Sequence, residues 1–171
     1  MGKHNRKASI ERIGIKGMFR VHIVDPDGSI TGDSGWCKNQ TTALGLQNFL
    51  AGAMAGSAGS KQIAYMALGT GGLVATTGTT LPGEIMGSTQ RVTVASSFSS
   101  RTTTGGSCTQ WFYATFNSAN SFLTGAGSNL SNIGLYAATT TNDTLFAGNT
   151  YASSACASNQ SVNATYQIQL G

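Results

Sequence analysis

The sequence predicts a mainly β protein: a β-sandwich or jelly-roll-like body with one short α-helix. Several short segments alternate apolar and polar residues with the period of two that a strand with one buried face requires. Clusters of Gly, Asn, Asp, Ser and Pro separate these segments, as turns do in β proteins. At 171 residues the chain is long enough for one domain with a core. We therefore expect residues 18–171 to form a single β-rich domain and residues 1–17 to form an extended basic arm.

The body begins with a predicted hairpin. Its first strand, residues 18–24, places three large apolar side chains on one face: Phe19, Val21 and Ile23. The Asp-Pro-Asp-Gly sequence at 25–28 suits a reversal, because proline presets φ and glycine accepts positive φ. The return strand is expected over residues 29–36.

Residues 42–55 carry the helical pattern, with Thr41 or Thr42 as the N-cap and Gly56 as the end. Their apolar residues follow the i, i+3, i+4, i+7, i+8 spacing of a single face: Leu46, Phe49, Leu50, Ala53 and Met54. The pattern therefore predicts one amphipathic helix.

Everything after the helix is predicted to be β. A short apolar strand over 63–68 opens into a glycine-rich loop and a flexible excursion that ends at Gly83. Residues 91–98 are expected to form one strand with Val92, Val94 and Phe98 on one face. Residues 108–116 carry bulky groups on both faces, which favours a central strand covered on both sides. The remaining predicted strands are a hairpin of 133–137 with 145–151 and a strictly alternating last strand over 162–170.

Charge is concentrated at the N-terminus. The first twenty positions hold six of the ten basic residues against the single acid Glu11, a net of +5, whereas the rest holds four basic and five acidic residues, a net of −1. Charged residues make up 9% of the chain, against roughly 25% in ordinary soluble domains. A body whose polarity comes from hydroxyl and amide groups suits a subunit packed among others, since few charges repel a neighbour. A monomer with a Ser/Thr-rich surface is the alternative.

The arm combines basic residues with isoleucines. This mixture favours docking into a protein groove, with isoleucines buried and Lys/Arg at the rim, over binding to nucleic acid or a solvated tail. The residues expected to contact a partner are Lys3, Arg6, Lys7, Ile10, Arg12, Ile13, Ile15, Lys16 and Arg20. Nucleic acid is a less favoured partner.

The residues do not predict an enzyme, a metal site or a cofactor. Gly32-Asp33-Ser34-Gly35 matches the tetrapeptide around a serine-protease nucleophile, but His22 belongs to the same hairpin, so we interpret the tetrapeptide as a turn. Three cysteines cannot all pair within one chain and lack metal-ligand spacing. No apolar run approaches the ~20 residues of a membrane span, and no secretory signal is expected.

Several short motifs follow one another between residue 36 and residue 170. They are Trp36-Cys37-Lys38-Asn39-Gln40-Thr41 before Gly45-Leu46, Met66-Ala67-Leu68-Gly69-Thr70-Gly71, Thr80-Leu81-Pro82-Gly83-Glu84, Ser131-Asn132-Ile133-Gly134-Leu135-Tyr136 with Leu145-Phe146-Ala147, and the last strand. In this order they resemble the small structural proteins of tailed bacteriophages. The resemblance implies a non-catalytic virion component, associated with the tail, a fibre or the head.

The leading hypothesis is therefore a virion subunit, made in the host bacterial cytoplasm, that self-associates as a trimer or ring. Its arm would dock onto another virion protein in a capsid-decorating, cementing, tail-adaptor or fibre-attachment role. The alternative is a receptor- or glycan-binding tip of a tail fibre. Its site would lie between loops 73–83 and 102–106, with Trp111 or Tyr113 stacking on a sugar.

Overall fold

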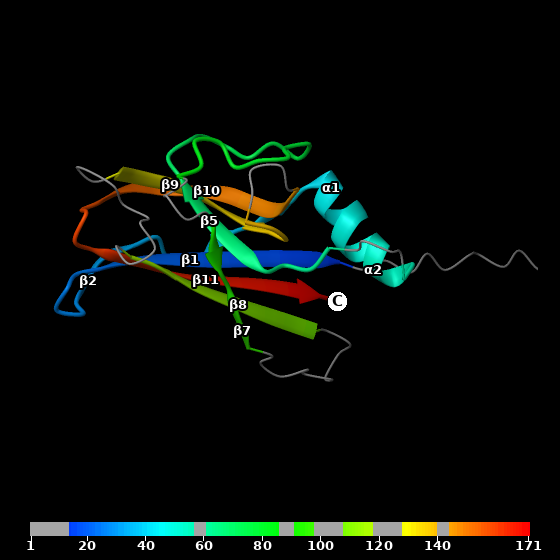
Figure 1. Ribbon diagram of the computed structural model, residues 1–171, viewed down its shortest axis with the longest axis horizontal. Helices are drawn as coiled ribbons and strands as arrows, with labels where there is room; N and C mark the ends of the chain where they lie inside the picture. The colour runs from blue at the N-terminus through cyan, green and yellow to red at the C-terminus, as the bar shows by residue number, and fades with distance from the viewer. Residues whose placement is uncertain (1–13, 57–60, 86–90, 98–107, 118–127, 140–143) are drawn as a thin grey trace, which may run out of the picture.

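The structure is a computed structural model that describes residues 14–56, 61–85, 91–97, 108–117, 128–139 and 144–171. It confirms a mainly β fold with two antiparallel sheets and one short helix (Figure 1). Residues 1–13 of the predicted arm lie outside the described residues. Residues 15–17, which were also assigned to the arm, belong to the first strand.

In the first sheet, called sheet A here, the two strands that are furthest apart in the sequence pair with each other. The strands that begin and end the described chain, β1 and β11, pair along their whole length, from Ile15 opposite Leu170 to Val24 opposite Ser161. The order across the sheet is β2-β1-β11-β8-β7, and β3 also pairs with β1. The bounds are β1 Ile15–Val24, β2 Ile30–Asp33, β3 Cys37–Lys38, β7 Ala95–Ser97, β8 Cys108–Phe116 and β11 Ser161–Leu170.

The second sheet, sheet B, has the order β4-β10-β9-β5-β6. Its bounds are β4 Gln40–Thr41, β5 Tyr65–Gly69, β6 Val92–Thr93, β9 Ser128–Tyr136 and β10 Leu145–Cys156. The predicted pairing of the two segments around residue 140 is confirmed, because Leu145 of β10 lies opposite Tyr136 of β9. Residues 140–143 of that connection lie outside the described residues.

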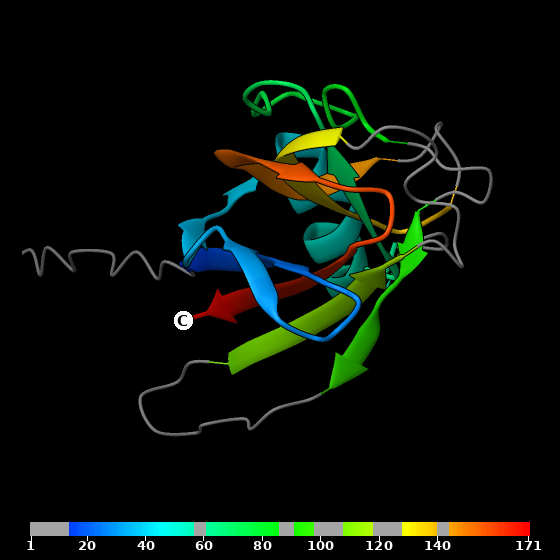
Figure 2. The same cartoon turned by 90° about the vertical axis from the view of Figure 1, so that its left-hand side faces the viewer.

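The two sheets share one buried core. Alternate residues of β1, β8 and β11 meet alternate residues of β5, β9 and β10 in a single apolar cluster that includes Phe19, Phe116, Tyr166, Leu68 and Ile133. Figure 2 shows sheet B above sheet A. The predicted inward positions of β1 and β11 are confirmed, because a period of two fixes which side chains share a face.

The predicted single strand over residues 91–98 is wrong. β6 pairs with β5 in sheet B, whereas β7 pairs with β8 in sheet A. Val94 lies between them and donates its backbone N–H to the carbonyl of Ala64 (2.9 Å). The chain therefore crosses from one sheet to the other at Val94, a change of partner that an alternating pattern does not reveal. Phe98 lies outside the described residues.

The prediction that residues 108–116 form an interior strand is confirmed. The prediction that both faces of this strand are covered is wrong. β8 is an interior strand between β11 and β7. Phe112, Ala114 and Phe116 are buried in the core, but Tyr113 on the opposite face is 38% exposed. No described element covers this outer face of sheet A, so the bulky residues there meet solvent.

The helix runs without a break through α1 (Ala43–Gly45), η1 (Leu46–Ala51) and α2 (Gly52–Met54). Thr42 is its N-cap, as predicted: its hydroxyl accepts the N–H of Gly45 (2.9 Å) and donates to the carbonyl of Leu145 (2.6 Å). Gly56 follows the helix with a φ of +60°, which confirms the predicted end.

The apolar face of this helix is only partly buried. Leu46 and Met54 are 40% and 72% exposed, while Phe49 is buried. The helix instead turns Gly45 toward sheet B, where the absence of a side chain allows close contact with the Phe146 backbone. Its central turn is a π-helix, whose wider winding shifts the side chains away from the α-helical spacing that the pattern assumes.

The segment over residues 70–83, predicted to be a flexible excursion, is packed onto the outer face of sheet B. Val74 and Leu81 are buried against Ala67, Tyr136 and Leu145 in a second apolar cluster. Backbone and side-chain hydrogen bonds hold the segment as well, including the Leu81 N–H to the Tyr136 hydroxyl (2.6 Å). The glycine content predicts a mobile segment, but the burial of Val74 and Leu81 fixes it.

Candidate functional site

The arm joins the body at the end that carries the helix (Figure 1). Gly14 and Gly171 exchange two backbone hydrogen bonds, of 2.7 and 3.0 Å, which extend the β1–β11 ladder by one residue. Ile15 packs against the core, and Lys16 is exposed. The chain is therefore held in an extended ladder from Gly14, its first described residue, onward. Residues 1–13 of the arm precede this point.

An apolar groove lies at the same end of the body. It consists of two hollows that share Leu50, with volumes of about 430 Å³ and 320 Å³. The first is lined by Ile15, Gly17, Asn39, Thr41, Leu46 and Leu50. The second is lined by Phe49, Leu50, Lys61, Gln62, Ile63, Gln110, Phe112 and Phe146. We call these two hollows together the helix-end groove.

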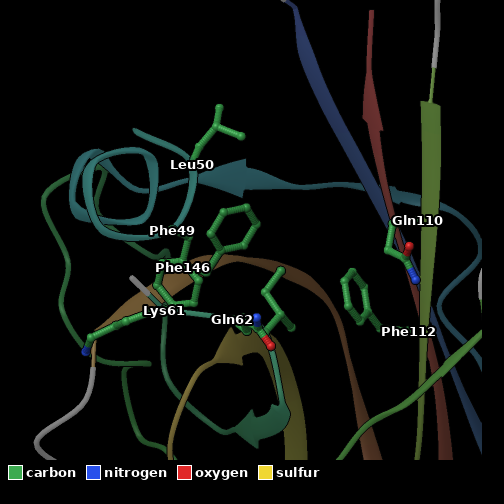
Figure 3. A pocket seen from close by; sticks show the side chains of 8 residues that line it. Phe49, Leu50, Lys61, Gln62, Gln110, Phe112 and Phe146 are labelled. Atoms are coloured by element: carbon green, nitrogen blue, oxygen red, sulfur yellow. The ribbon is translucent and has the colours of Figure 1, made fainter. Parts of the chain in front are cut away.

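The helix-end groove is open between the helix and sheet A. In Figure 3, Leu50 and Phe49 come from the helix, while Phe112 and Gln110 project from β8 across the gap. The lining of the second hollow is mostly aromatic and aliphatic, whereas half of the first is Gly17, Asn39 and Thr41. Lys61 is the one charged lining residue among those described. The Lys61 ammonium donates to the hydroxyl of Thr144 (3.3 Å) at its edge. The groove therefore suits an apolar segment.

The structure places only part of the predicted partner-contacting set. Six of its members lie outside the described residues: Lys3, Arg6, Lys7, Ile10, Arg12 and Ile13. Of the three in β1, Ile15 lines the helix-end groove, whereas Arg20 points to the outer face of sheet A and forms an ion pair with Asp33. The groove itself was not predicted, because it is assembled from the helix and from strands far apart in the sequence.

A second candidate site is a cluster of three aromatic side chains on the outer face of sheet A. The rings of Trp111 and Tyr113 are parallel, with centroids 6.5 Å apart and an interplanar angle of 6°. Trp36 contacts Trp111 edge-on, with centroids 5.8 Å apart. Trp111 and Tyr113 were predicted as stacking residues, and the structure adds Trp36. We call these three residues the aromatic cluster.

Trp36 reaches the cluster across the sheet. It precedes β3, which pairs with β1, while Trp111 belongs to β8, two strands further on. Its ring must therefore extend over β1 and β11. No local pattern could have identified Trp36, because its neighbour is set by the strand order.

The strand positions directly beside the two rings of β8 are neutral. Thr165 and Gln167 of β11 lie directly opposite Tyr113 and Trp111 in the ladder. Arg20 of β1 lies opposite Thr165 on the other side of β11, and it forms an ion pair with Asp33. The Arg20 guanidinium, together with the Gly35 N–H, holds the pKa of the Asp33 carboxyl well below its usual range. Both charges of this pair are therefore present at neutral pH and compensate each other.

The sugar site as predicted is not brought together. The 73–83 segment covers the outer face of sheet B, whereas Trp111 and Tyr113 lie on the outer face of sheet A. The core lies between the two sheets, and Figure 2 shows the 73–83 segment above sheet B with sheet A below. The loop at 102–106 lies outside the described residues. The described residues around these rings belong to sheet A and to the chain that enters β3.

The serine of the protease-like tetrapeptide has a structural role. The Ser34 hydroxyl accepts the Val21 N–H (2.9 Å) and donates to the Gly35 carbonyl (2.8 Å). The first contact joins β1 to the turn that follows β2, and the second lies within that turn. Within the described ranges, no three His, Cys, Asp or Glu side chains gather as a metal site, and the cysteines are free. No helix among the described residues has the length and apolar character to cross a membrane.

Comparisons with protein-family models, with curated proteins and with solved structures give no match for this chain. The two sites described above are therefore interpreted from their own geometry and chemistry.

Proposed function

We propose that this protein is a structural subunit of a tailed-bacteriophage particle, which self-associates and docks onto another virion protein through its N-terminal arm. The resemblance of its motifs to those of phage structural proteins supports the assignment to a phage particle. The sparse charge of the body supports close packing of subunits. Capsid decoration, cementing, tail-adaptor and fibre-attachment roles all fit this description. A trimer or ring is the expected assembly, because closed rotational symmetry is usual for identical subunits.

One observation carries the proposal: the arm leaves the body beside the helix-end groove. The arm supplies two isoleucines, Ile10 and Ile13, immediately before Gly14. The groove supplies apolar lining residues for them, including Leu46, Leu50 and Phe112. Burying one isoleucine contributes ~1.5 to 3 kcal/mol, so two anchors give a useful docking energy.

The arm of a second subunit is the better occupant of the groove. Gly14 is held in the extended β1–β11 ladder, and a chain that continued this strand would lead away from its own body. A return to its own groove would need a sharp reversal directly before Gly14, and residues 8–13 contain neither Gly nor Pro. Exchange of arms between subunits avoids that reversal.

The test is a disulfide between Ile13→Cys and Leu50→Cys in the full chain, with exposed Cys108 replaced by Ser. We expect oxidised covalent dimers and higher rings on non-reducing gels. The matched control is Met54→Cys in place of Leu50→Cys, because Met54 is exposed on the same helix but does not line the groove. Equal cross-linking of both pairs, or only intramolecular bridges, would contradict the exchange.

Self-association is tested by analytical ultracentrifugation. The full chain should sediment as a discrete oligomer, and deletion of residues 1–13, which leaves β1 intact, should shift it toward the monomer. The particle assignment is tested by mass spectrometry of purified phage particles from cultures that produce the protein. A monodisperse monomer, together with particles free of the protein, would reject the proposal.

A further inference from the structure

The aromatic cluster differs from the other exposed apolar residues of the body. The large hydrophobic side chains that are at least partly exposed include four aliphatic ones, Ile30, Leu46, Met54 and Leu73, and all four lie elsewhere. Trp36 and Tyr113, which are 44% and 38% exposed, both belong to the cluster. A patch made for another protein mixes aliphatic and aromatic side chains at its centre. The three side chains of this cluster are all aromatic.

The rings lie on a rigid support. Trp111 and Tyr113 are two residues apart on β8, which pairs over nine positions with β11. Phe112, between these two residues, and Ala114, next to Tyr113, are buried in the core. The orientations of the two rings are therefore set by the sheet, and a ligand does not have to order a loop in order to bind them.

The polar groups around the rings are hydroxyls and amides. Thr165 and Gln167 lie next to the rings on β11, and Thr115 and Asn163 continue the same face one row further. The Thr115 hydroxyl donates to the Asn163 carboxamide oxygen (2.9 Å). Arg20, the nearest cation in the ladder, is occupied by Asp33. Lys38 of β3, which lies opposite Met18, is further across the same face. The groups directly beside the two rings of β8 are therefore neutral, and neutral groups suit a neutral ligand with many hydroxyls.

From these observations we propose that the outer face of sheet A is a saccharide-binding surface, in which the aromatic cluster stacks on sugar rings. An aromatic face carries partial negative charge, and the C–H groups on one side of a pyranose carry partial positive charge, so the two surfaces attract while hydroxyls remain at the rim. Thr165, Gln167 and Asn163 are placed to accept and donate hydrogen bonds to those hydroxyls. The ligand class is an uncharged or N-acetylated oligosaccharide. The proposal does not depend on the phage assignment.

The chain carries its own probe for this site. Its two tryptophans, Trp36 and Trp111, both belong to the aromatic cluster, so tryptophan emission reports on this face alone. We would titrate the full chain with chitohexaose, cellohexaose and maltohexaose. The expected result is a saturable change in emission with at least one of them.

The variants separate stacking from folding. Tyr113→Ala retains both tryptophans and should weaken binding by roughly tenfold or more, the scale on which the loss of one stacking ring acts. Tyr113→Phe retains the ring and should bind nearly as tightly as the parent. Ile30→Ala removes an exposed apolar side chain from the same sheet, away from the cluster, and should leave binding unchanged. Thermal unfolding of each variant checks that it is folded.

Four outcomes would overturn the proposal. The first is no emission change with any of the three oligosaccharides. The second is saturable binding of (dT)12 or hexaproline without saccharide binding, which would assign the rings to nucleobases or to a peptide. The third is saccharide binding that Tyr113→Ala does not weaken. The fourth is an emission change on protein dilution alone that Tyr113→Ala removes, which would make this face a contact between copies. Deletion of residues 1–13 should leave saccharide binding intact, so failure of the arm proposal would be recognised separately.

Discussion

Arg91 and Glu84 form an ion pair that is shielded from water on the outer side of sheet B. Their side chains are 0% and 9% exposed, and the guanidinium donates from Nε to Oε1 (2.7 Å) and from Nη2 to Oε2 (3.2 Å). The guanidinium carbon lies 3.3 Å from the centroid of the Tyr136 ring, and the Tyr136 hydroxyl donates to Glu84 (3.1 Å). This network joins the end of the 70–85 segment to β9 and to the chain that enters β6.

Glu84→Gln should destabilise the fold by about 3 to 5 kcal/mol, because it leaves the Arg91 charge buried without its counter-ion. Urea unfolding followed by circular dichroism measures the change. The double variant Glu84→Leu with Arg91→Met is the control: it removes both charges and should cost less than Glu84→Gln alone. If the single variant has the stability of the parent, the pair does not hold the segment in solution.

The Tyr151 hydroxyl is buried and has no hydrogen-bond partner within the described part of the chain. Its ring packs edge-on against Phe19, with centroids 6.0 Å apart. Tyr151→Phe retains that packing and removes a desolvated hydroxyl, so the free energy of unfolding at pH 7 should stay equal or rise by up to about 1 kcal/mol. A loss of more than that would indicate a hydrogen bond to the hydroxyl in solution.

The same substitution should change the alkaline stability of the protein. Burial raises the pKa of Tyr151, and likewise that of Tyr136, above the value of the unfolded chain. A tyrosine with a raised pKa in the folded state contributes its full stability below pH ~10 and loses it as the pH rises above that value, since the unfolded state then releases its proton first. Unfolding free energies between pH 8 and 11 should fall less steeply for Tyr151→Phe than for the parent.

Thr42 links the helix to sheet B through one hydroxyl. It caps the Gly45 N–H and donates to the Leu145 carbonyl, and the residue is fully buried. Thr42→Ala should therefore cost about 1 to 2 kcal/mol in urea unfolding. Thr42→Ser retains the hydroxyl and should recover most of that loss. Equal losses for both substitutions would show that the methyl group, and not the hydroxyl, matters.

Gly45 is required where the helix meets β10. A Cβ at this position would lie 2.1 Å from the Phe146 carbonyl oxygen, a backbone atom that cannot move aside cheaply. Gly45→Ala should displace the helix, lower the melting temperature markedly and deform the helix-end groove. Gly72→Ala is the matched control, because a Cβ there meets nothing within 4 Å. Its melting temperature should stay near that of the parent, and a similar drop in both would contradict the close contact.

The aromatic cluster shows how far the sequence reaches into the candidate site. Trp111 and Tyr113 could be named because they are two residues apart on a recognisable strand, so they share a face. Trp36 could not, because its contact with Trp111 exists only when β3, β1, β11 and β8 lie in that order. The helix-end groove was missed for the same reason, since Leu50 and Phe112 come from elements about sixty positions apart.

By itself the sequence determined the mainly β class, the inward faces of β1 and β11, the Thr42 cap and the end of the helix at Gly56. All of these follow from local periodicity and from the backbone preferences of single residues. Only the tertiary structure decided which face of the helix is buried, where the chain crosses between sheets at Val94, and that the 70–85 segment is packed. Those outcomes depend on which distant surface each segment meets, because burial and pairing with remote partners outweigh the propensity of a short segment.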